Sequence, residues 1–174
     1  MELNPQKEAQ KILSTPRLWK EGLFPVDPIT ICRNLDLAVV ETELPTVETE
    51  LPTNVSGALI KEIGKEPVIV LHKSDSNNRK RFSCAHELGH YISRTESNDI
   101  EQKYEYIDLR NSLSAYGTDK NEIFANTFAA NLLMPEEEVK QLSQEKKPYF
   151  EMALYFGVSP EALKIRLKTL GLLK

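Results

Sequence analysis

The residues best suited to chemistry lie in the stretch FSCAHELGHYIS, residues 82–93, which holds two of the three histidines of the chain. His86 and His90 are four positions apart, so on a helix they lie one above the other and can direct ring nitrogens at one point. Zinc accepts histidine nitrogens at about 2.0–2.1 Å, and its catalytic sites use three protein ligands and keep one position open. The spacing therefore predicts two ligands of a catalytic zinc ion.

Glu87 directly follows the first of these histidines. At about 3.6 residues per helical turn it is rotated by about 100° from His86, so it flanks the ion without having to bind it. Zinc lowers the pKa of a bound water towards about 7, and a neighbouring carboxylate can take the proton. Glu87 is therefore the predicted catalytic base.

Two simpler interpretations of the motif remain open. The histidines can cap or pair locally on a solvated helix face, and a closed structural zinc site would need a fourth protein ligand. Cys32 and Cys84 do not supply one readily, because they are far apart and form no CxxC pattern. We expect both to be reduced, buried thiols. The third histidine, His72, lies on a predicted strand, where a satisfied or exposed side chain is the simpler expectation.

A third ligand has to come from elsewhere in the chain, and NEIFANTFAANLLMP, residues 121–135, offers one. Glu122 is the acidic residue of an otherwise apolar helix, where an unpaired carboxylate would be costly. It is the predicted ligand, although it can also be a helix-end charge behind an Asn121 N-cap. Asn126 lies one turn further on and can hydrogen-bond Glu122 or substrate.

The remaining pattern predicts an α+β fold that is mainly helical. Proline follows a capping residue at Asn4 and Asp27, which predicts two short helices near the N-terminus. Segments rich in β-branched residues predict a three-stranded sheet beside the motif helix, with a hairpin at Gly64; they span 37–44, 55–63 and 67–73. The region 96–120 is expected to be loop-rich, with at most short helices. Two C-terminal helices joined at Gly157 have helix-turn-helix spacing.

Length predicts one compact domain over 1–174, with the helical pair of 146–174 packed on it; the HExxH motif makes it a predicted metallopeptidase domain. The net charge of −4 gives no general electrostatic reason to expect nucleic acid or an anionic membrane as partner. The N-terminus does not resemble a secretory signal, and no apolar run approaches the ~20 residues needed to span a bilayer. A cytoplasmic location is therefore expected.

Taken together, RFSCAHELGHYI, the later NEIFANTFAANLLMP and the strand segment SGALI resemble the ImmA/IrrE family of zinc metallopeptidases. The resemblance implies a small thermolysin-like zincin core and one zinc ion per chain, held by His86, His90 and Glu122. It also implies Glu87 as the catalytic base. Typical substrates of the family are helix-turn-helix repressors, often encoded nearby, which are cut at a specific site to derepress phage, mobile-element or stress genes.

Such a peptidase also needs a donor for the tetrahedral oxyanion. The candidates are side chains near the two motifs, and the sequence does not rank them: Arg81, Tyr91, Tyr104, Tyr106 and Tyr116. An extended substrate can add to the edge of the small sheet.

Two rival functions stay open. The chain can be a zinc-binding regulator that sequesters the repressor without cutting it. Alternatively, the C-terminal helices can dock a partner or contact DNA through a modestly basic set of side chains, Lys164, Arg166, Lys168 and Lys174.

Overall fold

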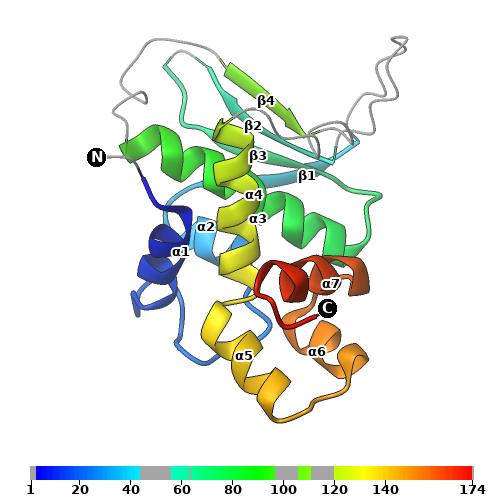
Figure 1. The fold of residues 1–174 in the computed structure, drawn as a ribbon. Coiled ribbons are helices and arrows are strands. Elements are labelled where there is room, and N and C mark those ends of the chain that lie inside the picture. Colours follow the sequence, from blue (N-terminus) through cyan, green and yellow to red (C-terminus); the bar gives the residue numbers. More distant parts are fainter. Residues whose placement is uncertain (1–2, 44–55, 63, 97–105, 111–119, 174) are drawn as a thin grey trace.

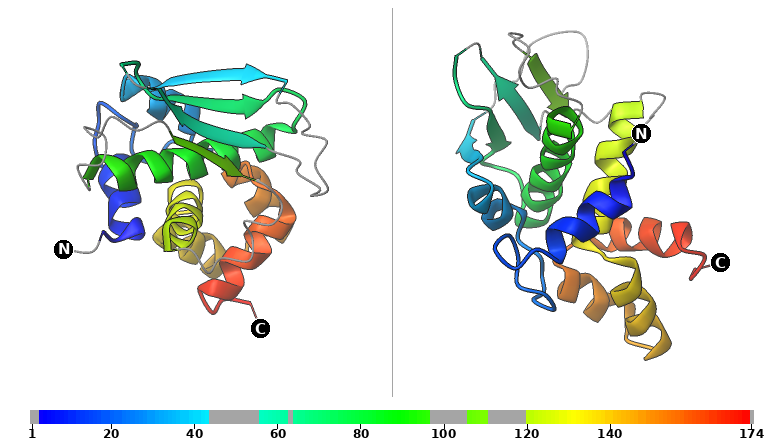
Figure 2. Two further views of the ribbon diagram at one scale, coloured as in Figure 1. Left: turned by 90° about the horizontal axis from the view of Figure 1, so that it is seen from above. Right: turned by 90° about the vertical axis from the view of Figure 1, so that its left-hand side faces the viewer.

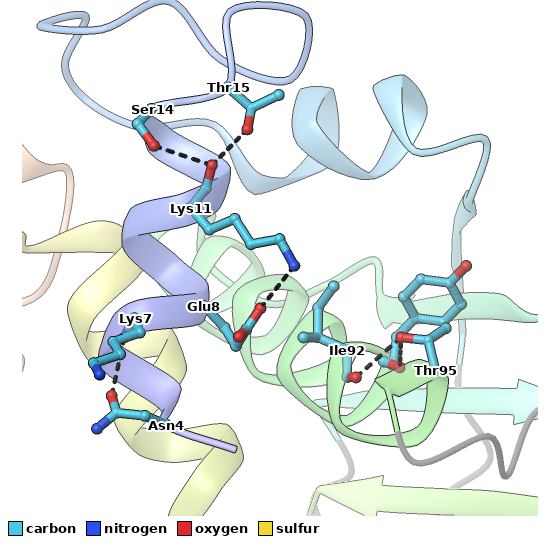
Figure 3. A network of polar contacts seen from close by, with 9 residues as sticks. Asn4, Lys7, Glu8, Lys11, Ser14, Thr15, Ile92 and Thr95 are labelled. Atoms are coloured by element: carbon cyan, nitrogen blue, oxygen red, sulfur yellow. Dashed lines mark hydrogen bonds and ion pairs between the residues drawn. The ribbon is translucent and has the colours of Figure 1, made fainter. Parts of the chain in front are cut away.

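The two N-terminal helices begin at the predicted capping residues. The computed structural model describes residues 3–43, 56–62, 64–96, 106–110 and 120–173. Helix α1 spans Pro5–Leu13, and the Asn4 side chain accepts a hydrogen bond from the backbone N–H of Lys7. Figure 3 shows this cap and the pairing of Glu8 with Lys11 on the same helix. Helix α2 spans Pro28–Asn34 and is capped in the same way by Asp27.

The predicted strands form a sheet with the order β1-β3-β2-β4. Strands β1 (Ala38–Thr42) and β3 (Val68–His72) are parallel, and β2 (Gly57–Lys61) is antiparallel to β3, which confirms the hairpin. A fourth strand, β4 (Tyr106–Arg110), pairs antiparallel with the free edge of β2. The expectation of loops and short helices was wrong for these five residues, because pairing with a distant strand decides their conformation. The remainder, 97–105 and 111–119, lies outside the described residues.

Helix α3 (Asn77–Glu96), which carries the HExxH motif, is covered on several sides. The sheet lies against one side and α4 (Lys120–Leu133) against the opposite side, as Figure 2 shows. Every residue from 83 to 90 is buried as a result. The helical spacing of Phe82, Ala85, Gly89 and Ile92 indicates a single buried face of α3. The buried surface of the helix is wider than this face, because α3 lies between two layers and packs on both of them.

Gly89 allows α3 and α4 to approach closely. A Cβ atom at this position would lie 3.0 Å from the Ala125 Cα and 3.1 Å from Cδ1 of Phe128. Gly89 directly precedes His90 on α3, and Ala125 lies in the first half of α4. This contact therefore fixes how near the side chains of α4 come to the two imidazoles.

We expect Gly89→Ala to destabilise the fold by about 1–3 kcal/mol, because the added methyl group must push the helices apart. Denaturant unfolding of both proteins measures the change. Helix propensity alone predicts the opposite sign, a gain of about 0.5–1 kcal/mol for alanine over glycine. A more stable Gly89→Ala protein would therefore contradict the close contact.

Three helices follow α4 and pack below it in Figure 1: α5 (Glu136–Gln144), α6 (Tyr149–Phe156) and α7 (Pro160–Thr169). Gly157 ends α6 in the left-handed conformation, and the Ser159 side chain caps α7. Phe156 and Leu163 join the buried core. The predicted helical pair thus forms and packs against the described remainder of the chain. No helix among the described residues is long and apolar enough to cross a membrane.

Candidate metal centre

The structure brings His86, His90 and Glu122 together. The Nε2 atoms of the two histidines are 3.0 Å apart. Glu122 Oε1 lies 3.0 Å from His90 Nε2, and Oε2 lies 3.5 Å from His86 Nε2. In the part of the chain that the structure describes, this is the group of His, Cys, Asp and Glu whose atoms can hold a metal ion.

These separations fit three ligands of one ion. Ligand atoms at about 2.0–2.1 Å from a tetrahedrally coordinated ion lie about 3.3–3.4 Å from one another. The three observed separations of 3.0, 3.0 and 3.5 Å bracket that value. Two imidazole nitrogens and one carboxylate oxygen are also donors that a divalent transition-metal ion accepts. The donor set therefore suits such an ion in both geometry and chemistry.

Burial and charge make this an unusual place for polar groups. His86 and His90 are only 1% and 3% exposed, whereas the Glu122 side chain is 23% exposed. The hydrogen bond and the charge of His86, together with the charge of His90, lower the pKa of Glu122 against the opposing effect of burial. A carboxylate that stays ionised beside two buried imidazoles is suited to binding a cation.

Helix α4 settles how Glu122 is positioned. The helix begins at Lys120, so Asn121 lies inside it and is not its N-cap. Glu122 is in the first helical turn and at the same time reaches both histidines. Glu122 is thus a charge in the first turn of α4 and also a neighbour of both imidazoles.

Asn126 orients the ring of His86. Its Oδ1 lies 3.0 Å from His86 Nδ1, while the Nε2 of the same ring faces His90 and Glu122. When Nδ1 carries the proton it donates to Asn126, which leaves the Nε2 lone pair for a metal ion. The sequence predicted a hydrogen bond of Asn126 to Glu122 or substrate, and the structure shows a contact with His86 that the sequence did not predict.

Replacing Asn126 by alanine is expected to lower metal affinity about 10–100-fold, because the ring loses the acceptor that fixes its tautomer and orientation. Competition with a chelator of known affinity measures the change. Asn126→Asp keeps an acceptor at this position and should stay near the wild-type value. Equal losses in both variants would contradict an orienting role.

Glu87 lies on the side of α3 that faces the sheet. Its side chain is fully buried, and a Cβ at Gly57, the first residue of β2, would lie 3.4 Å from Glu87 Oε1. The same Cβ would lie 3.2 Å from Ser83 Cβ. Gly57 therefore lets β2 pass close to α3 at Ser83 and Glu87. We did not predict this role, although a glycine inside a strand often marks a close approach of another group.

The other singled-out polar side chains lie apart from this group. His72 ends β3, where its Nδ1 accepts from the backbone N–H of Ser74, as expected of a satisfied strand histidine. Cys32 and Cys84 are buried free thiols with their sulfur atoms 3.8 Å apart. This confirms the prediction that both cysteines are reduced, buried thiols. The hydrogen bond to Cys32 and burial raise the pKa of the Cys84 thiol.

The predicted oxyanion donors have different surroundings in the structure. The Arg81 guanidinium donates to the backbone carbonyls of Val26, Phe156 and Gly157, so it holds the turn between α6 and α7 in place. Tyr91 is half-buried against the core, and burial raises its pKa. Tyr104 and Tyr116 lie outside the described residues, as does the side chain of Tyr106. The geometry therefore adds no support for Arg81 as an oxyanion donor.

Comparison with protein families identifies the family of the chain. The Peptidase_M78 family model, described as the IrrE N-terminal-like domain, matches residues 32–168, which is most of the chain. The chain belongs to this family. The match covers α3 and α4, and with them all four residues of the HExxH-and-Glu122 arrangement. The resemblance to the ImmA/IrrE family is thereby confirmed, and the fold is α+β as expected.

A similar protein comes from Bacillus phage phi105 and is named "Uncharacterized immunity region protein 2". It is 31% identical over 98 residues, which are 56% of this chain and 57% of the phage protein. The matched part is thus little more than half the length of that relative.

Proposed function

We propose that the chain is a zinc metallo-endopeptidase that cleaves a helix-turn-helix repressor at one specific site. The observation that carries the proposal is the meeting of His86, His90 and Glu122 around one point, with the buried Glu87 next to His86 on the same helix. Membership of a family of peptidases supports the reaction type. The name of the relative, which places that protein in a phage immunity region, supports a regulatory substrate.

Each residue of the candidate site has its own role in the proposed peptide hydrolysis. Bound zinc would polarise the scissile carbonyl and acidify a water molecule. His86, His90 and Glu122 would hold the ion. Glu87 accepts a proton from the attacking water and passes it to the departing amine, which lets one carboxylate serve both halves of the reaction. Burial of Glu87 keeps bulk water from competing for that proton.

Strand β4 offers a place for the substrate backbone. It pairs with β2 on one side and forms an edge of the described sheet. Figure 2 shows that this edge lies on the side of the sheet nearer to α4, which carries Glu122. We infer that an extended substrate segment adds to β4 by backbone hydrogen bonds, as peptides do at other open sheet edges.

The test is to incubate the purified, zinc-loaded protein with a helix-turn-helix repressor encoded beside it and to analyse the products by mass spectrometry. A single cut is expected, and it should disappear when a chelator removes the zinc and return when zinc is restored. Intact repressor under every metal condition would refute the peptidase, whereas stable complex formation without a cut would support sequestration.

Contact with DNA through the C-terminal helices finds little support. Arg166 is buried, and it donates to the Met134 carbonyl and to Asn131 Oδ1. Among the four basic residues considered for this role, that leaves Lys164 and Lys168 exposed in the described region, while Lys174 lies outside it. Two exposed lysines on an acidic protein make a weak electrostatic footprint for nucleic acid.

A further inference from the structure

A groove of about 790 Å³ lies next to the candidate metal centre, in the angle between α3 and α4, with α7 as its far wall. Figure 1 shows how α3, α4 and α7 are arranged. The near end of the groove is lined by Asn126, whose Oδ1 lies 3.0 Å from His86 Nδ1. Its volume is within the range of about 300–1,000 Å³ that is usual for ligand sites.

The groove continues the same faces of α3 and α4 that carry the metal ligands. Phe82 lies one turn before His86 on α3, and Ala130 lies one turn after Asn126 on α4; both line the groove. One helical turn is about 5.4 Å, and an extended peptide advances about 3.3 Å per residue. A substrate with its scissile bond at the metal centre therefore reaches the groove within about two residues.

Six of the residues that line the groove are apolar: Phe82, Ala130, Met134, Val158, Ala162 and Ile165. Ile165 is 66% exposed, so a large hydrophobic side chain stands in solvent at the groove wall. Polar residues line the groove as well, among them Glu161, and Arg79 on α3 is bonded to Asp75 at 3.3 Å and to the Ser56 hydroxyl. The apolar side chains favour an apolar occupant.

The wall formed by α7 is held rigidly. Arg166 Nε donates to the Met134 carbonyl at 3.0 Å, and Nη2 donates to Asn131 Oδ1 at 2.7 Å. Arg166 is only 6% exposed, so these bonds join α7 to the end of α4 in a buried place. A wall that is ordered before binding loses little conformational entropy when a ligand enters.

We propose that this groove, here the α7 groove, binds a large apolar side chain of the substrate, such as Leu, Ile, Met or Phe, within two residues of the scissile bond. The inference rests on the proposed peptidase function and adds the side-chain preference of that function. The occupant is a polypeptide side chain because Asn126 both lines the groove and contacts His86, and because apolar side chains form part of the lining.

Short peptide hydroxamates provide a test that does not depend on cleavage, because the hydroxamate binds the metal and places the neighbouring residue. Two series, with the variable residue before or after the hydroxamate, should carry Gly, Leu or Lys there. Calorimetry with the zinc-loaded protein measures the affinities. In one series we expect Leu to bind at least about tenfold more tightly than Gly.

Ile165→Asp places a charge in the α7 groove at an exposed position, where the fold does not depend on the side chain. The preference for Leu over Gly should fall below about threefold, and Lys should gain relative to Leu. Leu154→Asp is the matched control, because Leu154 is 63% exposed and lies on α6 outside the groove lining. It should keep the wild-type preference.

The outcomes separate the two proposals. Zinc-dependent binding without a preference for Leu, or with the same preference in Ile165→Asp, overturns the α7 groove and leaves the metal centre intact. Failure of the protein to retain zinc overturns the proposed function itself. A benzoylphenylalanine in place of Leu adds a direct measurement: its photoadducts should fall on α4 and α7, and adducts confined to other elements would also overturn the groove.

Discussion

Glu87→Gln is expected to reduce the rate of repressor cleavage about 10²–10⁴-fold while the protein still binds one zinc ion. Glutamine has the shape of glutamate but cannot take a proton from water. The three predicted ligands are untouched, so zinc affinity should stay near wild type. Single-turnover cleavage followed by mass spectrometry gives the rate, and atomic emission gives the metal content.

Glu137→Gln is a suitable control for this experiment. Its side chain is 92% exposed and lies in the first turn of α5, remote from the proposed chemistry. The same loss of one negative charge there should leave cleavage unchanged. Undiminished cleavage by Glu87→Gln would exclude Glu87 as the base even if the metal centre is correct.

Glu122→Ala is expected to lower zinc affinity by at least about 100-fold, more than the loss of an orienting neighbour of a ligand would cause. The substitution removes one of three donors and the only negative charge among them. Competition with a chromophoric chelator measures the affinity, and cleavage should fall in parallel.

Ile123→Ala tests whether any change at the start of α4 has the same effect. Ile123 is the next residue along the helix and is 50% exposed, so its loss should alter neither zinc binding nor cleavage. Stoichiometric zinc that resists chelation in Glu122→Ala would remove Glu122 from the ligand set. The two HExxH histidines would then need a different third partner.

The metal centre was predictable because its determinants are local. The spacing of His86 and His90 becomes a shared direction as soon as the segment is a helix. Glu122 was identifiable because a charge on an otherwise apolar helix needs a partner. In each case the geometry follows from the helical period and from the cost of burying charge, both of which can be read from short stretches of sequence.

Features that depend on distant pairings were not predictable in this way. Strand β4 forms because β2 offers it an edge, and its five residues alone do not reveal that. The role of Gly57 depends on how β2 meets Glu87, and the α7 groove depends on where α7 packs. The helical spacing of Phe82, Ala85, Gly89 and Ile92 indicates one buried face of α3, whereas the structure buries every residue from 83 to 90 because a layer packs on each side.

The approach of α3 and α4 at Gly89 has a consequence for folding as well as for chemistry. An ion held by His90 and Glu122 would join two helices that are separated by a long stretch of chain, and it would act as a cross-link in the folded state. Bringing the two ends of that stretch together costs conformational entropy. Binding of the ion to the folded state would offset part of that cost. A ligand that binds the native state alone at 100 times its dissociation constant adds about 2.7 kcal/mol of stability. The supply of metal in the cell would thereby set how long the protein persists, in addition to whether it is active.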